Sequence, residues 1–254
     1  MERTIIVFDT ETTSLVKPFC YNVGWVVARL EENGSYHILE EKEFMCKQVW
    51  YNTMLFSTAY YADKKALYHD RIKQHFIEVK RVEEVMEILS KSIEYYNIDF
   101  GYAYNASFDI KVFQFMSDWF RTPNPIAEIP VYDIRAYFMH LVDGKESFAE
   151  FCEEYERFTE SGNYSTTAET AFQYMENIPG FEEEHTALAD SEIELMILSD
   201  CAEHGEDIFH YVKTKKSLPR RVQKDYTIQY QNKDYTLKGY SATWYKNKNK
   251  LVIK

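Results

Sequence analysis

Two acidic residues stand where an apolar segment of the chain ends. Residues 4–9 form a short run rich in β-branched side chains, which predicts a buried strand with Asp9 as its last residue. Glu11 follows two positions later, so on extended backbone both carboxylates point to the same side. At about 4 Å and an effective dielectric near 20 they would repel each other by about 4 kcal/mol. Such a pair at a strand end favours a bound cation, and two solvated acids are the alternative.

Two further acids occupy positions that a cation would explain. Asp109 lies in the first turn of a helix that follows a strand predicted for residues 98–104. Taken alone, stabilisation by the helix dipole would account for it. Asp190 lies beside Ile193 on the apolar face of a helix predicted for residues 186–201. A carboxylate that points inward is costly unless it is paired or bound to a metal.

His185 precedes Asp190 by five residues. In one continuous helix this spacing is a rotation of about 140°, so the two side chains would not share a face. They can converge if His185 stands in the loop before the helix. A surface histidine beside the glutamates at 182–184 is the alternative. An imidazole pKa near 6.5 suits proton transfer at neutral pH, and we expect the neighbouring glutamates to raise it.

The ordered set of these five residues resembles the DEDDh family of 3′–5′ exonucleases, which includes DnaQ-like and RNase T-like enzymes. The matching segments are Phe8–Thr13, Asn105–Asp109 and His185–Asp190. The resemblance covers about residues 4–203, and residues 162–190 are also similar to stand-alone members from bacteriophages and bacteria. Two positions depart from the family pattern, because Ser14 stands where Gly is frequent and Tyr104 where His is frequent. Both lie near the substrate rather than the metal.

The resemblance implies a fold, a cofactor and roles for the site residues. The fold would be α/β and ribonuclease H-like, with a mixed five-stranded sheet flanked by helices. Two divalent ions, Mg²⁺ or Mn²⁺, would be held by the four acids Asp9, Glu11, Asp109 and Asp190. His185 would act as the general base that takes a proton from the attacking water. Oxygen ligands suit these hard ions.

The same resemblance places four residues at the 3′ end of the substrate. The backbone at Thr12 and Thr13 would meet the terminal hydroxyl, and the side chains of Leu15 and Phe108 would contact the last bases. Base stacking on an aromatic ring tolerates any sequence. For Phe108, packing in the core is the alternative.

The remaining sequence patterns predict the elements that carry these residues. Helical periodicity extends over residues 60–96. Alternation and β-branched content predict strands at residues 4–9, 20–30, 36–46, 98–104 and 129–132.

The charge of the chain is unevenly distributed. The 254 residues carry a net charge of −12, which by itself disfavours nucleic acid as a partner. Residues 211–254, however, carry 12 basic and 2 acidic residues, so this segment is +10 and the rest is −22. We therefore expect an exonuclease domain at residues 1–210 and a basic, aromatic-rich β appendage at residues 211–254. The appendage either binds a phosphate backbone and stacks bases, or docks on the acidic domain.

These observations lead to one expected function and two alternatives. We expect a metal-dependent 3′–5′ exonuclease that releases nucleoside monophosphates from DNA, preferably single-stranded. An exoribonuclease is the runner-up, because metal chemistry at the phosphate does not read the 2′-hydroxyl. A non-catalytic module that binds nucleic acid or a polymerase is the third reading, and proofreading would need a polymerase in trans.

The sequence also predicts where the protein acts. It contains no apolar stretch of about 20 residues that would span a membrane, no secretory signal pattern and no C-x-x-C pair. We expect a cytoplasmic protein, in the host cytoplasm if it is encoded by a phage, with no membrane partner.

Overall fold

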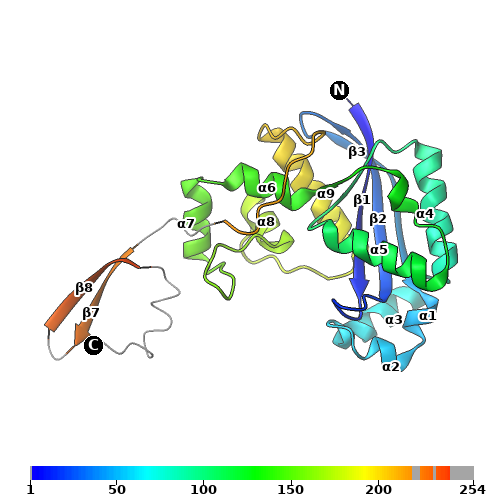
Figure 1. Ribbon diagram of the computed structural model, residues 1–254, viewed down its shortest axis with the longest axis horizontal. Coiled ribbons are helices and arrows are strands. Elements are labelled where there is room, and N and C mark those ends of the chain that lie inside the picture. Colours follow the sequence, from blue (N-terminus) through cyan, green and yellow to red (C-terminus); the bar gives the residue numbers. More distant parts are fainter. Residues whose placement is uncertain (1, 219–223, 231–232, 241–254) are drawn as a thin grey trace.

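The computed structural model describes residues 2–218, 224–230 and 233–240. Its centre is a six-stranded sheet with the order β4-β3-β2-β1-β5-β6, covered by helices on both faces (Figure 1). The strands are β1 (Glu2–Thr12), β2 (Cys20–Glu31), β3 (Tyr36–Cys46), β4 (Glu78–Lys80), β5 (Phe100–Ala103) and β6 (Val131–Asp133). The prediction of a mixed α/β sheet is confirmed, but the predicted number of five strands is wrong.

The first three strands form an antiparallel meander, and the other three add to it in parallel. β1 pairs with β2, and β2 with β3, in antiparallel register. The turn between β2 and β3 contains Gly34 at φ +91°, a conformation that favours glycine and closes the predicted hairpin. β5 lies parallel to β1, β6 parallel to β5, and β4 parallel to β3.

The additional strand comes from the segment that we expected to be helical. Residues 60–96 contain helix α3 (Lys65–Lys73), then β4, then helix α4 (Val82–Tyr96). The predicted apolar face of α4 is buried, as expected from its periodicity. β4 has three residues and lies at the edge of the sheet, so it is too short to interrupt a helical pattern in the sequence.

Both faces of β1 are covered, which explains why its centre is apolar without interruption. Ile5 and Val7 pack in one core with the later helices, whereas Ile6 and Phe8 pack in a second core on the opposite face. The first face carries α6 (Ile134–Val142), α7 (Glu146–Glu154), α8 (Ala168–Met175) and α9 (Ala187–Glu203). The second carries α1 (Lys47–Trp50), α2 (Thr53–Phe56), α3, α4 and α5 (Ser107–Phe120), with the short 3-10 helices η1 (Ala62–Lys64) and η2 (Pro125–Glu128).

The C-terminal segment forms a separate hairpin. β7 (Lys224–Tyr230) pairs antiparallel with β8 (Lys233–Tyr240) in a two-stranded sheet of its own (Figure 1). The rest of the expected appendage, from residue 241 on, lies outside the described residues. Before the hairpin, the chain still contacts the main body, because Leu218 is buried in the first core and Thr214 donates a hydrogen bond to Asp133. None of the helices in the described ranges combines the length and apolar character that a membrane crossing requires.

Candidate active site

β1 carries the first two acids toward helix α9. The strand continues to Thr12, so Asp9 and Glu11 lie inside it and extend the alternation of Ile5 and Val7. Both carboxylates therefore belong to the sheet face that α9 covers. Glu11 is buried, and its Oε2 accepts a hydrogen bond from the hydroxyl of Tyr21 at 3.3 Å.

A glycine in β2 lets α9 approach these acids closely. Gly24 pairs with Asp9 across the two strands. A Cβ atom at Gly24 would lie 2.2 Å from the backbone nitrogen of Leu188 and 2.3 Å from the carbonyl carbon of Ala187. The first turn of α9 thus rests on bare backbone, and Asp190 in that turn faces the end of β1.

Asn22, also on β2, fixes where α9 begins. Its Oδ1 accepts a hydrogen bond from the backbone N–H of Ala187 at 2.9 Å and lies 3.3 Å from the hydroxyl oxygen of Tyr68. The Tyr68 hydroxyl also lies 3.0 Å from the carbonyl oxygen of His185, to which it can donate. The site histidine is therefore in the loop directly before the helix, with its backbone in the left-handed region at φ +54°.

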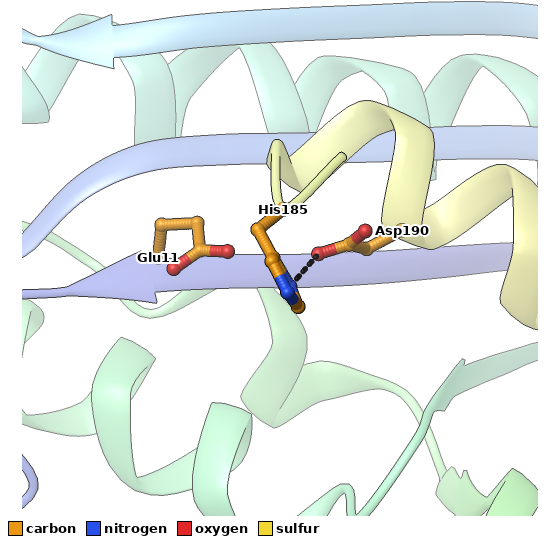
Figure 2. Close-up of side chains that lie close together, drawn as sticks. All are labelled: Glu11, His185 and Asp190. Atoms are coloured by element: carbon orange, nitrogen blue, oxygen red, sulfur yellow. Dashed lines mark ion pairs between the residues drawn. The ribbon is translucent and has the colours of Figure 1, made fainter. Parts of the chain in front are cut away.

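Three side chains converge at this point. Glu11, His185 and Asp190 each offer one ligand atom, and these atoms all lie within 4.8 Å of one another (Figure 2). The Nδ1 atom of His185 is 4.0 Å from Oδ2 of Asp190 and 3.5 Å from Oε2 of Glu183. Because His185 lies in the loop before α9, its side chain can reach Asp190 although the two residues are five positions apart.

Asp9 and Asp109 stand beside this group rather than inside the 4.8 Å set. Asp109 is buried in the first turn of α5, and its Oδ1 accepts a hydrogen bond of 2.6 Å from the hydroxyl of Thr10. Burial, and after it the charge of Asp9, raises the pKa of Glu11, Asp109 and Asp190. All four predicted acids therefore act on one another electrostatically.

Burial and mutual repulsion disfavour the ionised form of these acids unless a cation is bound. Burial raises the pKa of Asp9 to about 7. Burial, followed by the charges of Asp9 and Glu183, raises the pKa of Asp190 to about 10. The Oδ1 atom of Asp190 is buried and has no hydrogen-bond partner. An orphaned carboxylate oxygen among other acids is what a site for a hard divalent cation requires, so these residues fit Mg²⁺ or Mn²⁺.

The pKa of His185 moves in the opposite direction to the one we expected. Burial lowers it, the charge of Lys64 lowers it further, and Glu169 raises it by less. Our expectation that residues 182–184 raise this pKa is therefore wrong, because burial of the ring, and after it the charge of Lys64, favours the neutral imidazole. A lowered pKa keeps the imidazole neutral at neutral pH, the form in which it can accept a proton.

Sequence reasoning missed several charged or aromatic groups at the site. Glu194 is buried one turn after Asp190 and accepts a hydrogen bond from the backbone N–H of Tyr104 at 3.1 Å. Its i, i+4 spacing from Asp190 on the buried side of α9 was a signal that could have found it. Lys64 and Tyr61 come from the helical segment between β3 and β4, and no pattern in the sequence connects them to His185.

The four residues that we expected to contact the 3′ end of the substrate follow or end β1, or lie at the start of α5. Thr12 ends β1 and is half-buried, whereas Thr13 is buried and its N–H donates to the carbonyl of Phe19 at 2.9 Å. Leu15 is 74% exposed. Phe108, next to Asp109, is half-buried against the second core, so its ring serves core packing at least in part.

Comparisons with known proteins support the fold. No protein-family model matches the chain, and no curated protein sequence matches it. Among solved structures, it is similar to an ExoI/SSB-Ct complex at 12% identity and a TM-score of 0.51. It is also similar to a structure of exonuclease I at 13% identity and a TM-score of 0.50, and to a zinc-bound complex of E. coli ExoI with single-stranded DNA at 12% and 0.50.

These alignments cover 82% of this chain but only 42–43% of the exonuclease I chains. At such low identity they show the fold alone. The chain therefore shares a mixed α/β fold with part of these exonuclease I structures, and its sheet has one strand more than the sequence led us to expect. Since one fold can carry many activities, the function has to be argued from the side chains.

Proposed function

We propose that this protein is a metal-dependent 3′–5′ exonuclease that acts on DNA, preferably single-stranded. The observation that carries the proposal is the convergence of Glu11, His185 and Asp190 on one point, with Asp9 and Asp109 beside it. These residues come from β1, α5 and the start of α9, so three separate parts of the chain supply one acidic site with a single imidazole.

The acids would hold two divalent ions. Glu11 and Asp190 offer ligand atoms within 4.8 Å of each other, Oδ1 of Asp190 has no hydrogen-bond partner, and the charges of Asp9 and Asp109 act on this group. Bound ions of this kind neutralise charge on a phosphodiester and make a coordinated water more acidic. The carboxylates are already close together and dehydrated, so little rearrangement is needed to bind them.

His185 would receive the proton of the attacking water. Its ring is one-quarter exposed and reaches the acids through Nδ1. Because burial and Lys64 favour the neutral ring, the base is ready at neutral pH. The charge of Glu169, which raises the pKa of His185, would then help to stabilise the protonated imidazole until the proton leaves.

The exposed end of the site suits a single strand with a free 3′ end. Leu15 stands out from the surface just after β1, and Phe108 borders Asp109, so both could contact terminal bases, with the Thr12–Thr13 backbone at the 3′ hydroxyl. A fold neighbour, E. coli ExoI, forms a complex with single-stranded DNA. We assign the same class of substrate to this chain.

The C-terminal segment is proposed as an auxiliary strand-binding element. Its hairpin, β7 and β8, belongs to the part of the chain that carries a charge of +10. The main domain is strongly acidic, so attraction of a phosphate backbone must come from a local basic surface. We keep residues 1–210 as the proposed nuclease domain and residues 211–254 as the proposed appendage.

One assay tests the activity and its substrate. End-labelled single-stranded DNA and RNA of the same sequence are incubated with Mg²⁺, and a parallel sample contains EDTA. Stepwise shortening of the DNA from the 3′ end, with release of mononucleotides and complete inhibition by EDTA, is expected. Faster shortening of the RNA would reassign the substrate, and absence of any metal-dependent cleavage by the purified chain would overturn the proposal.

A further inference from the structure

The helical segment between β3 and β4 reaches across to the loop that holds His185. Four of its side chains contact this loop, and we call them the His185 clamp: Tyr61, Lys64, Tyr68 and Arg71. The loop is more than 110 residues away in sequence, so these are contacts between two distant parts of the fold.

Three members of the His185 clamp form hydrogen bonds with backbone or side-chain atoms of His185 and its two neighbours in sequence. The Lys64 ammonium donates to the carbonyl oxygen of Glu184 at 2.5 Å. Arg71 reaches the Glu184 carboxylate at 2.5 Å and the Thr186 hydroxyl at 3.4 Å. Tyr68 donates to the carbonyl of His185 itself. The loop is therefore held just before, at and just after the histidine.

Tyr61 acts on the imidazole directly. Its ring is stacked on that of His185, with centroids 4.2 Å apart and planes inclined by 16°. The Lys64 ammonium lies 5.1 Å from the centroid of the Tyr61 ring, an arrangement that favours a cation–π contact and holds this ring in turn. Stacking fixes the plane of the imidazole, and this plane decides where its two nitrogen atoms point.

The backbone of His185 needs such external support. A φ of +54° is uncommon for a residue other than glycine and persists where surrounding contacts impose it. Without the clamp, the loop would be free to relax to an ordinary conformation. The imidazole would then leave the acids at the ends of β1 and α9.

We propose that the His185 clamp holds the imidazole of His185 in the orientation needed for catalysis, and that Tyr61 is the positioning residue. This inference rests on the proposed function, in which His185 takes a proton. Tyr61 would touch neither metal nor the reacting atoms, and would act only through the orientation of the imidazole. Two other roles of the Tyr61 ring can be distinguished from positioning by experiment. The ring could stack on a substrate base, or it could only cover the hydrophobic core.

Substitutions at Tyr61 separate stacking from the phenol hydroxyl. Tyr61→Phe keeps the ring and should retain the wild-type kcat, whereas Tyr61→Leu should lower kcat about 10- to 100-fold, the size of effect expected when a catalytic group is misplaced. KM and Mn²⁺ affinity should not change. Tyr51→Leu is the matched control, because this tyrosine of the same segment is 63% exposed and its ring contacts none of the His185 clamp residues in the described structure, whereas Tyr60 packs against Tyr61. Equal loss in the Phe and Leu variants would overturn the stacking role.

A double-mutant cycle tests whether Tyr61 acts through His185. In a His185→Ala background, Tyr61→Leu should have no further effect on kcat, because the ring that it orients is gone. An additional loss of the same size as in the wild-type background would overturn the proposal and indicate a contact with substrate. A raised KM would do the same.

A spectroscopic measurement tests the clamp without any substrate. In proton NMR, stacking under an aromatic ring shifts the imidazole Cε1–H resonance of His185 upfield. The shift should persist in Tyr61→Phe and disappear in Tyr61→Leu, while melting temperatures stay close to that of the wild type. An unshifted resonance in the wild-type protein would overturn the clamp. This result is separate from the nuclease assay, whose failure would overturn the proposed function instead.

Discussion

Gly24 and Asp9 face each other across β2 and β1, and the first turn of α9 lies directly on the glycine. This arrangement brings Asp190 to the end of β1. The distance between β1 and α9, which carry these acids, is therefore set by the absence of a side chain at Gly24 of β2.

We predict that Gly24→Ala disrupts metal binding and stability together. The new methyl group would meet backbone atoms of Leu188 and Ala187, which cannot rotate away, so α9 has to move outward. We expect a loss of about 1–3 kcal/mol in the free energy of unfolding and weaker Mn²⁺ binding by calorimetry. Gly180→Ala is the control, since a Cβ there has nothing within 4 Å. Unchanged metal affinity in Gly24→Ala would contradict the close-approach argument.

Asp9→Ala should abolish cleavage and leave the fold intact. An acid of the proposed metal site is removed, and the repulsion that Asp9 exerts on Glu11, Asp109 and Asp190 is removed with it. Activity on single-stranded DNA and the circular dichroism spectrum are the measurements. A variant that cleaves at nearly the wild-type rate would contradict the metal site.

Asp190→Asn should stabilise the metal-free protein at alkaline pH. The pKa of Asp190 is raised to about 10, above its ordinary value, so the folded state binds the proton more tightly than the unfolded state. Stability is then present at low pH and is lost as the pH rises toward that value. At pH 8 we expect a gain of at least about 1 kcal/mol, or roughly 2–4 °C in melting temperature.

Bound metal should reverse the order of stability of the wild type and Asp190→Asn. Mg²⁺ should raise the melting temperature of the wild type more than that of Asp190→Asn, because the asparagine is a weaker ligand. Asp118→Asn, a change of an exposed acid on α5, is the control. If wild type and Asp190→Asn melt alike at pH 8 in EDTA, repulsion at Asp190 is not significant.

His185→Ala should lower kcat about 10²- to 10⁴-fold, as is usual for loss of a general base. Metal affinity should change little. In the wild type, the rate should fall only below the lowered pKa of the imidazole, that is, below its ordinary value near 6.5. The variant should lack this acidic limb. His37→Ala, at an exposed position of β3, is the control. Equal rates across pH 6–9 would remove His185 from the mechanism.

Truncation after Leu218 tests the appendage. This end point keeps the buried Leu218 and the contacts of Thr214 and Lys215 with the body. Long single strands should bind more weakly, and the slope of log K against log salt should flatten by about 0.7 for each lost phosphate contact. Hydrolysis of a dinucleotide should not change. A lower melting temperature with an unchanged salt slope would instead make the appendage a structural cover.

The sequence allowed β1, its two acids and α9 to be predicted because each is marked by a local pattern, a continuous apolar run in β1 and recurring apolar residues along α9. The acid on an apolar helix face and the histidine in the loop before it are likewise visible within a few residues of Asp190. β4 was missed because three residues, none of them buried, are too few to show a period. The predicted direction of the His185 pKa shift was wrong because it depends first on burial of the ring and then on Lys64, which is more than 100 positions away, and both arise only in the folded chain.

Helix α9 has a consequence for the time at which the site exists. Asp9 is made early in synthesis, but Asp190 follows about 180 residues later, and the sheet alone holds no complete set of ligands. At about 5–20 residues per second, the ribosome needs on the order of ten seconds or more to reach it. Until then the emerging polypeptide, which grows beside messenger RNA, lacks Asp190 and so lacks part of the proposed site. Under the proposed function, synthesis of α9, the last helix among the described residues, therefore completes the set of candidate ligands.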